Sequence, residues 1–134
     1  GRGVAADAEL AAEWAMRAAE QGLAEGQYFL AGLYSVGRGV ERDDGMAFSW
    51  LYRAAERDYA PAQASLGALY AEGTTVVPRD FEEAYFWLLR ATMSGVGETD
   101  INVEELARQV QGELTTERRV QVENRAVFWQ PRIR

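Results

Sequence analysis

Apolar residues recur along the chain with the period of an α-helix. In the segment 24–36, Gln27, Leu30, Ala31 and Tyr34 stand at i, i+3, i+4 and i+7, which places them on one helix face. The pattern predicts an all-α fold of seven helices. They are expected at residues 7–21, 24–36, 43–57, 60–72, 80–94, 102–113 and 116–130.

Residues at the ends of these segments favour helix boundaries. Gly37 follows the helix at 24–36, where a glycine readily takes the positive φ that ends a helix. Asp43 precedes the next apolar stripe and is expected to cap it. Asp80, with Glu83 three residues later, resembles a capping box. Each pair of helices is therefore predicted to form a hairpin.

The segments are also copies of one another. Residues 14–40 align with residues 50–77 at an offset of 36, which becomes 37 after an insertion at residues 74–76. The matched pairs include Trp14 with Trp50, Gln27 with Gln63, Leu30 with Leu66, Tyr34 with Tyr70, and Gly37 with Gly73. At the offset of 37 the match continues beyond these ranges, with Asp43 on Asp80 and Trp50 on Trp87. Such a repeat predicts an α-α superhelix, a solenoid of stacked hairpins. Because Trp14, Trp50 and Trp87 keep the repeat spacing, we expect them in the core between helices rather than in a carbohydrate-stacking row.

These residues resemble Sel1-like repeats, relatives of the tetratricopeptide repeats. The resemblance covers residues 1–94, where it implies Sel1-like hairpins, the first of them incomplete. Residues 95–134 diverge and are expected to form capping helices continuous with the repeats, the last carrying Val120, Val127 and Trp129. Because Gly1-Arg2-Gly3-Val4 repeats the tetrapeptide at 37–40, the chain is expected to open mid-repeat. The natural array would then continue upstream, or a second copy would form a homodimer through the open N-terminal edge.

Composition narrows the possible chemistry. The 134 residues include no Cys and no His, which excludes disulfides, thiol nucleophiles, the usual zinc ligands and the commonest general base. No metal and no cofactor is expected. The net charge of −7 argues against a nucleic-acid partner. No apolar run is long enough for membrane insertion.

Charge is unevenly distributed along the chain. Residues 115–134 carry five arginines against two glutamates. Arg118, Arg119 and Arg125 form a candidate basic patch for an acidic partner, and the alternative is a solvated capping helix. All fourteen basic residues are arginine, a bias typical of a GC-rich bacterial genome.

A carboxylate-based hydrolase is the enzymatic alternative. The adjacent pairs Asp43-Asp44 and Glu82-Glu83 could supply two carboxylates. Their places at helix starts explain them as caps and first-turn acids instead. We therefore predict no catalytic residue and no enzymatic activity.

A binding surface is expected on the first helix of each hairpin, which by analogy with tetratricopeptide repeats lines the concave face. The positions there outside the repeat core are Tyr28, Gly32, Ser35 and Val36 in one unit, and Ala64, Ala68, Ala71 and Glu72 in the next. Of these, Tyr28, Ser35, Val36, Ala68 and Glu72 are the candidate partner-binding residues.

The resemblance implies an adaptor or scaffold that binds another protein or peptide, with a regulatory, signalling or assembly role in bacteria. Family members often occupy the periplasm, which favours a periplasmic or secreted location over a cytoplasmic one. A structural spacer within a longer multi-repeat protein is the alternative.

Overall fold

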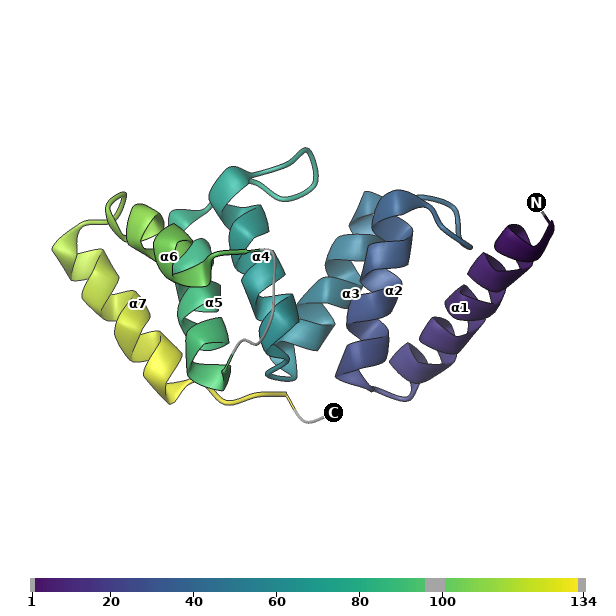
Figure 1. The fold of residues 1–134 in the computed structure, drawn as a ribbon. Helices are drawn as coiled ribbons and strands as arrows, with labels where there is room; N and C mark the ends of the chain where they lie inside the picture. Colours follow the sequence, from purple (N-terminus) through teal and green to yellow (C-terminus); the bar gives the residue numbers. More distant parts are fainter. Residues whose placement is uncertain (1, 96–100, 133–134) are drawn as a thin grey trace.

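The computed structural model describes residues 2–95 and 101–132, which form seven α-helices. The helices follow one another in a curved row from α1 at one end to α7 at the other (Figure 1). Their bounds are α1 Arg2–Glu20, α2 Ala24–Val36, α3 Asp44–Glu56, α4 Ala60–Glu72, α5 Phe81–Ser94, α6 Val103–Gln111 and α7 Thr116–Phe128. The predicted all-α solenoid is confirmed.

The predicted helix boundaries are set by the expected residues. Asp43 caps α3 by accepting a hydrogen bond from the backbone N–H of Met46, and Asp80 caps α5 by accepting from Glu82 and Glu83. Gly37 ends α2 at φ 73°, in the left-handed region. At the first helix the prediction was wrong, because α1 begins at Arg2 rather than residue 7.

The repeat reproduces its packing as well as its sequence. The buried Gln27 donates from Nε2 to the carbonyl of Ala19 at 3.4 Å, and the equivalent Gln63 donates to Ala55 at 3.1 Å. Each glutamine thereby fastens the first helix of a hairpin to the helix before it. Leu30 and Leu66 occupy the same place in successive units and are both fully buried.

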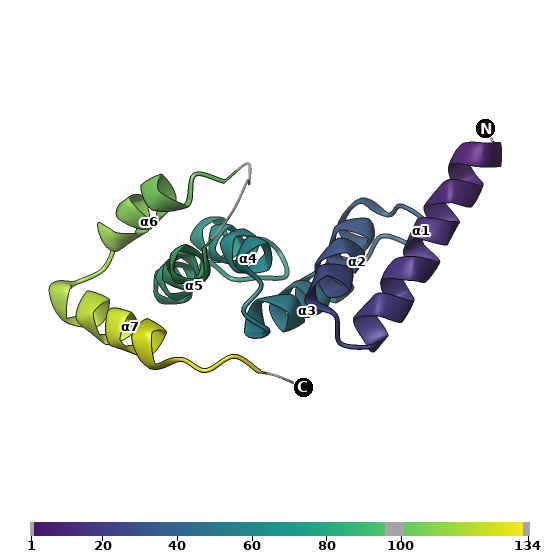
Figure 2. The same ribbon diagram turned by 60° about the horizontal axis from the view of Figure 1, so that its bottom comes forward.

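Burial of the three repeat tryptophans differs along the row. Trp87 is 1% exposed and Trp50 is 8% exposed, as predicted for core positions. Trp14 is 56% exposed, so its predicted burial is wrong. The physical reason is its place on α1, which stands at the end of the row and packs on α2 (Figures 1 and 2).

The C-terminal helices cover the far end of the row. Figure 2 shows α6 and α7 flanking α5, and the segment after α7 running back toward α3. There Trp129 packs edge-on against Trp87 at 5.7 Å and Phe86 at 6.2 Å between ring centroids. Within α7 the buried residues are Val122 and Ala126, whereas the predicted Val120 and Val127 are exposed. Residues 96–100 of the predicted link lie outside the described residues.

Candidate functional site

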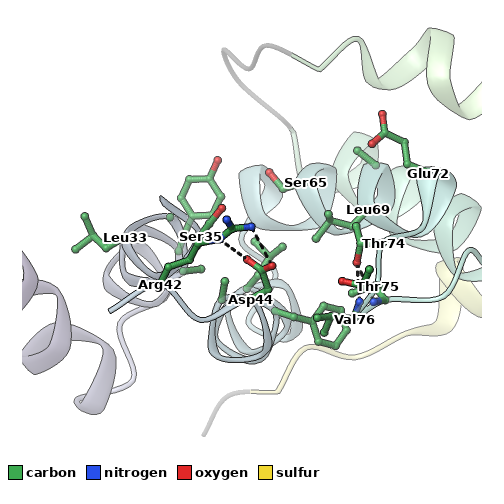
Figure 3. Close-up of a pocket in the computed structure, with 18 of the residues that line it drawn as sticks. Leu33, Ser35, Arg42, Asp44, Ser65, Leu69, Glu72, Thr74, Thr75 and Val76 are labelled. Atoms are coloured by element: carbon green, nitrogen blue, oxygen red, sulfur yellow. Dashed lines mark hydrogen bonds and ion pairs between the residues drawn. The ribbon is translucent and has the colours of Figure 1, made fainter. Parts of the chain in front are cut away.

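A groove of about 880 Å³ lies between α2 and α4, with residues of α3 between them (Figure 3). The α2 wall carries Tyr28, Gly32 and Ser35, and the α4 wall carries Ser65, Ala68, Leu69 and Glu72. Small side chains on the walls leave the space open. A Cβ atom added at Gly32 would meet no atom of the opposite wall or of any other neighbouring element within 4 Å. The repeat thus places two first helices face to face across a concave surface.

The part of the groove formed by α3 is apolar. Ala47, Phe48 and Leu51 lie there, and Phe48 packs edge-on against Tyr70 with 6.1 Å between ring centroids. Burial first, then the charge of Glu83, raises the pKa of Tyr70 to about 12. A tyrosine phenol is neutral at pH 7 even at its ordinary pKa of about 10, so no charge lies beside Phe48. Such a lining suits an apolar side chain from a bound molecule.

Charged groups stand at the edges of this space. Arg42 and Asp44 form an ion pair at 3.2 Å, drawn as a dashed line in Figure 3, so their charges compensate. Glu72 is exposed and makes no ion pair with any residue that the structure describes. The groove therefore carries one uncompensated negative charge at the C-terminal end of α4.

A loop closes one side of the groove. Residues 74–77 follow α4, and Thr74, Thr75 and Val76 line the space. The loop holds its own shape: the Thr74 N–H donates to the Val77 carbonyl at 2.7 Å, and the Thr74 hydroxyl accepts from Val76 and Val77. This is the insertion that changes the repeat offset from 36 to 37.

The structure places four of the five candidate binding residues in this groove. Tyr28, Ser35, Ala68 and Glu72 line it, whereas Val36 is 70% exposed and lies outside the lining. Val36 follows Ser35 around α2, so its side chain points to another side of the helix. Of the further positions on the first helices, Gly32 lines the groove, Ala64 is fully buried, and Ala71 packs against the core.

Sequence reasoning missed the parts of the groove outside the first helices. These are chiefly Phe48 and Leu51 on α3, the Arg42–Asp44 pair, and the loop residues. Apolar α3 positions are indistinguishable from core in a periodic pattern. The insertion at 74–76 was the one sequence signal for this part of the groove. A residue added within a repeat maps to a loop on one face, outside the packing between neighbouring units.

The three arginines of the candidate basic patch are engaged within the fold. Arg118 pairs with Glu82 at 3.6 Å and Arg125 with Glu83 at 2.8 Å, which ties α7 to the first turn of α5. Arg119 pairs with Glu123 on its own helix at 3.7 Å. These pairs agree with the capping-helix alternative, but the three arginine side chains are still 40–61% exposed, so the basic patch stays a prediction.

The carboxylates of the hydrolase alternative are likewise occupied. Asp43 caps α3 and Asp44 pairs with Arg42, while Glu82 and Glu83 pair with α7. Among the described residues, no group of three or more acidic side chains is placed to hold a metal ion. The same part of the chain contains no helix long and apolar enough to cross a membrane.

Comparison with known proteins agrees with this architecture. The family model described as Sel1 repeat matches residues 1–23, 24–59 and 60–96. No curated protein matches the chain. Two bacterial crystal structures are similar to it. The protein c5321, a protective antigen present in uropathogenic Escherichia coli strains and displaying an SLR fold, is 28% identical with a TM-score of 0.73. A Sel1 repeat protein from Oxalobacter formigenes is 27% identical with a TM-score of 0.66.

The two similarities extend over most of this chain but only part of each relative. They cover 88% of the chain and 24% of c5321, and 89% of the chain and 49% of the Oxalobacter protein. The family match spans most of the chain, and the fold is a row of helical hairpins with a concave groove. The chain therefore belongs to the Sel1 repeat family.

Proposed function

We propose that the chain is an adaptor that binds a segment of another protein in the groove between α2 and α4. The observation that carries this proposal is an open space of about 880 Å³ with an apolar lining between two first helices. Sel1 repeats generally mediate protein interactions. In this chain the groove lies along the sides of the first helices, α2 and α4, that are not packed in the repeat core. No covalent chemistry is required of the site.

The lining defines the chemistry of the bound segment. Phe48, Leu51 and Leu69 favour an apolar anchor, and Tyr28 and the serines offer hydrogen bonds along the walls. The uncompensated Glu72 favours a Lys or Arg beside that anchor. A short amphipathic segment with one basic residue fits both requirements.

A selection from a random peptide library displayed on phage tests this proposal. We expect selected peptides to combine an apolar anchor with Lys or Arg, and to shift the backbone amide NMR signals of Ser35, Ser65 and Ala68. Ala68→Arg fills the groove and should weaken binding of a selected peptide at least about tenfold. Val36→Arg places the same side chain on α2 outside the groove and should leave the affinity unchanged.

Two results would contradict the adaptor role. Peptides that bind both variants equally, with NMR shifts outside the groove, would move the binding surface elsewhere. A selection that yields no binding peptide would favour the alternative of a spacer within a longer protein. A Glu72→Gln variant separates the two parts of the proposal, because it removes the preference for basic residues while leaving the apolar anchor in place.

A further inference from the structure

The helix α1 exposes a narrow stripe of four side chains, none of which lines the groove between α2 and α4. Asp7, Leu10, Trp14 and Arg17 follow one another at steps of three, four and three residues, the spacing of a helix–helix seam. All four are exposed, with Leu10 at 62% and Trp14 at 56%. Neither Asp7 nor Arg17 makes an ion pair within the described part of the chain. The stripe therefore has an apolar centre and opposite charges at its two ends.

The repeat shows that this position is a packing position. Trp50 on α3 and Trp87 on α5 are the equivalents of Trp14, and they are 8% and 1% exposed. On α1, Trp14 makes a ring contact with Phe29 of α2, edge-on at 5.9 Å. Phe29 is itself 45% exposed and also lines the edge of the groove, so the apolar surface extends from α1 onto α2.

The order of residues in the stripe makes it complementary to itself. If two copies of α1 cross antiparallel about a two-fold axis level with Ala12, Leu10 of one copy faces Trp14 of the other. The same symmetry places Asp7 of each copy opposite Arg17 of the other, which gives two ion pairs. A two-fold interface joins the same patch on both subunits, so each contact occurs in duplicate. In a parallel pairing, by contrast, Asp7 would face Asp7 and Arg17 would face Arg17.

We propose that the exposed stripe of α1 binds a second copy of this chain, forming an antiparallel two-fold dimer held by Leu10–Trp14 contacts and Asp7–Arg17 ion pairs. One pair of helices buries less surface than a standard stable interface. The two Glu13 side chains, one residue before Trp14 on each copy, bring like charges beside the seam. The dimer is consequently weak and depends on protein concentration. None of the four residues of the stripe lines the groove between α2 and α4, so the proposal does not rest on the proposed function.

Charge reversal tests the pairing directly by sedimentation velocity over a wide concentration range. Asp7→Arg and Arg17→Asp each convert two attractions into two repulsions, and each should raise the dimer dissociation constant at least about tenfold. The double variant D7R/R17D restores opposite charges and should dimerise like the unmodified chain. An equimolar mixture of the two single variants should form a heterodimer. In that mixture one chain carries arginine at both charged positions of the stripe and the other carries aspartate at both, so each arginine faces an aspartate.

Glu9→Arg is the matched control, since it reverses a charge on the exposed part of the same helix away from the stripe. It should not weaken the dimer. Helix content measured by circular dichroism confirms that the variants fold. A chain that stays monomeric at every concentration would overturn the proposal. So would a dimer that neither single reversal weakens, or a mixture of the single variants that does not associate.

Discussion

At the scale of single residues, Asp58 stands out because it occupies, in the turn between α3 and α4, the place that Gly22 has 36 residues earlier in the repeat. Its φ of 67° lies in the left-handed region, where a side chain is costly by roughly 1 kcal/mol. The carboxylate offsets this cost with three hydrogen bonds to Oδ1. Ser94 and Gln63 donate to it, and Arg90 donates at 3.1 Å as part of an ion pair. One strained residue thus links the turn to α4 and α5.

These hydrogen bonds make stability depend on pH. Burial alone raises the pKa of Asp58, but the hydrogen bonds from Ser94, Gln63 and Arg90 outweigh it and hold the pKa below its ordinary value. Because the folded-state pKa is lowered, the carboxylate stabilises the fold at pH values above the unfolded-state pKa of about 4. That contribution is lost as the pH falls through the folded-state pKa.

We therefore expect Asp58→Asn to lower the free energy of unfolding by about 1 kcal/mol at neutral pH. It should also reduce the loss of stability between neutral pH and about pH 3. Urea unfolding at the two pH values measures both effects. Asp44→Asn is the control, since Asp44 belongs to an exposed pair and should change stability little. Identical pH profiles for the unmodified protein and Asp58→Asn would contradict the assignment.

At the scale of elements, the segment after α7 acts as the last packing layer of the row. Trp129 contacts the rings of Trp87 and Phe86, and the guanidinium of Arg90 lies 4.9 Å from its centroid. Farther on, the Arg132 N–H donates to the carbonyl of Glu56 at the C-terminal end of α3, at 2.6 Å. A stretch without regular structure thereby covers Trp87.

Removal of this ring should therefore destabilise the whole C-terminal end. We expect Trp129→Ala to lower the free energy of unfolding by about 3 kcal/mol, because it opens a space over Trp87. The neighbouring Phe128 is 78% exposed, and Phe128→Ala should cost no more than about 0.5 kcal/mol. Urea unfolding of the two variants makes the comparison. Equal costs would show that the segment does not pack on α5 in solution.

At the scale of the whole molecule, each middle helix of the row packs against the helices before and after it, whereas α1 has a neighbouring helix on one side. The helix α5 packs against α4, α6, α7 and Trp129, whereas α1 packs mainly on α2. In a solenoid each unit is stabilised by the units it touches. Stability is therefore expected to fall toward α1.

Amide hydrogen exchange should show this gradient. Amides of α5 should exchange only through global unfolding, and those of α1 should exchange faster through local opening. If α1 pairs with a second copy, its protection should also rise with protein concentration, whereas that of α5 should not. Uniform protection along the row would indicate that the chain unfolds as one cooperative unit.

How much of this was predictable depends on the range of each interaction. Asp43, Asp80 and Gly37 act on groups a few residues away, so local patterns revealed their roles. The glutamines and leucines of the core were visible because the repeat presents them twice. The pairing of Arg125 with Glu83 joins residues 42 apart, and no periodic signal indicates it. Trp14 kept the sequence pattern of a buried residue, but burial depends on a neighbour that the pattern does not contain.

The loop at residues 74–77 has a consequence for how such a protein changes during evolution. The Thr74 hydroxyl accepts hydrogen bonds from the backbone N–H groups of Val76 and Val77, and Val77 is the one residue of this loop that is buried. Under the proposed function, mutations at Thr75 and Val76 would therefore alter which segment binds in the groove, while the stacking of the hairpins stays intact. Duplication of a hairpin preserves the framework, and variation of one loop would diversify the segment that the proposed site binds. New specificity can then arise without a loss of stability that later substitutions would have to repair.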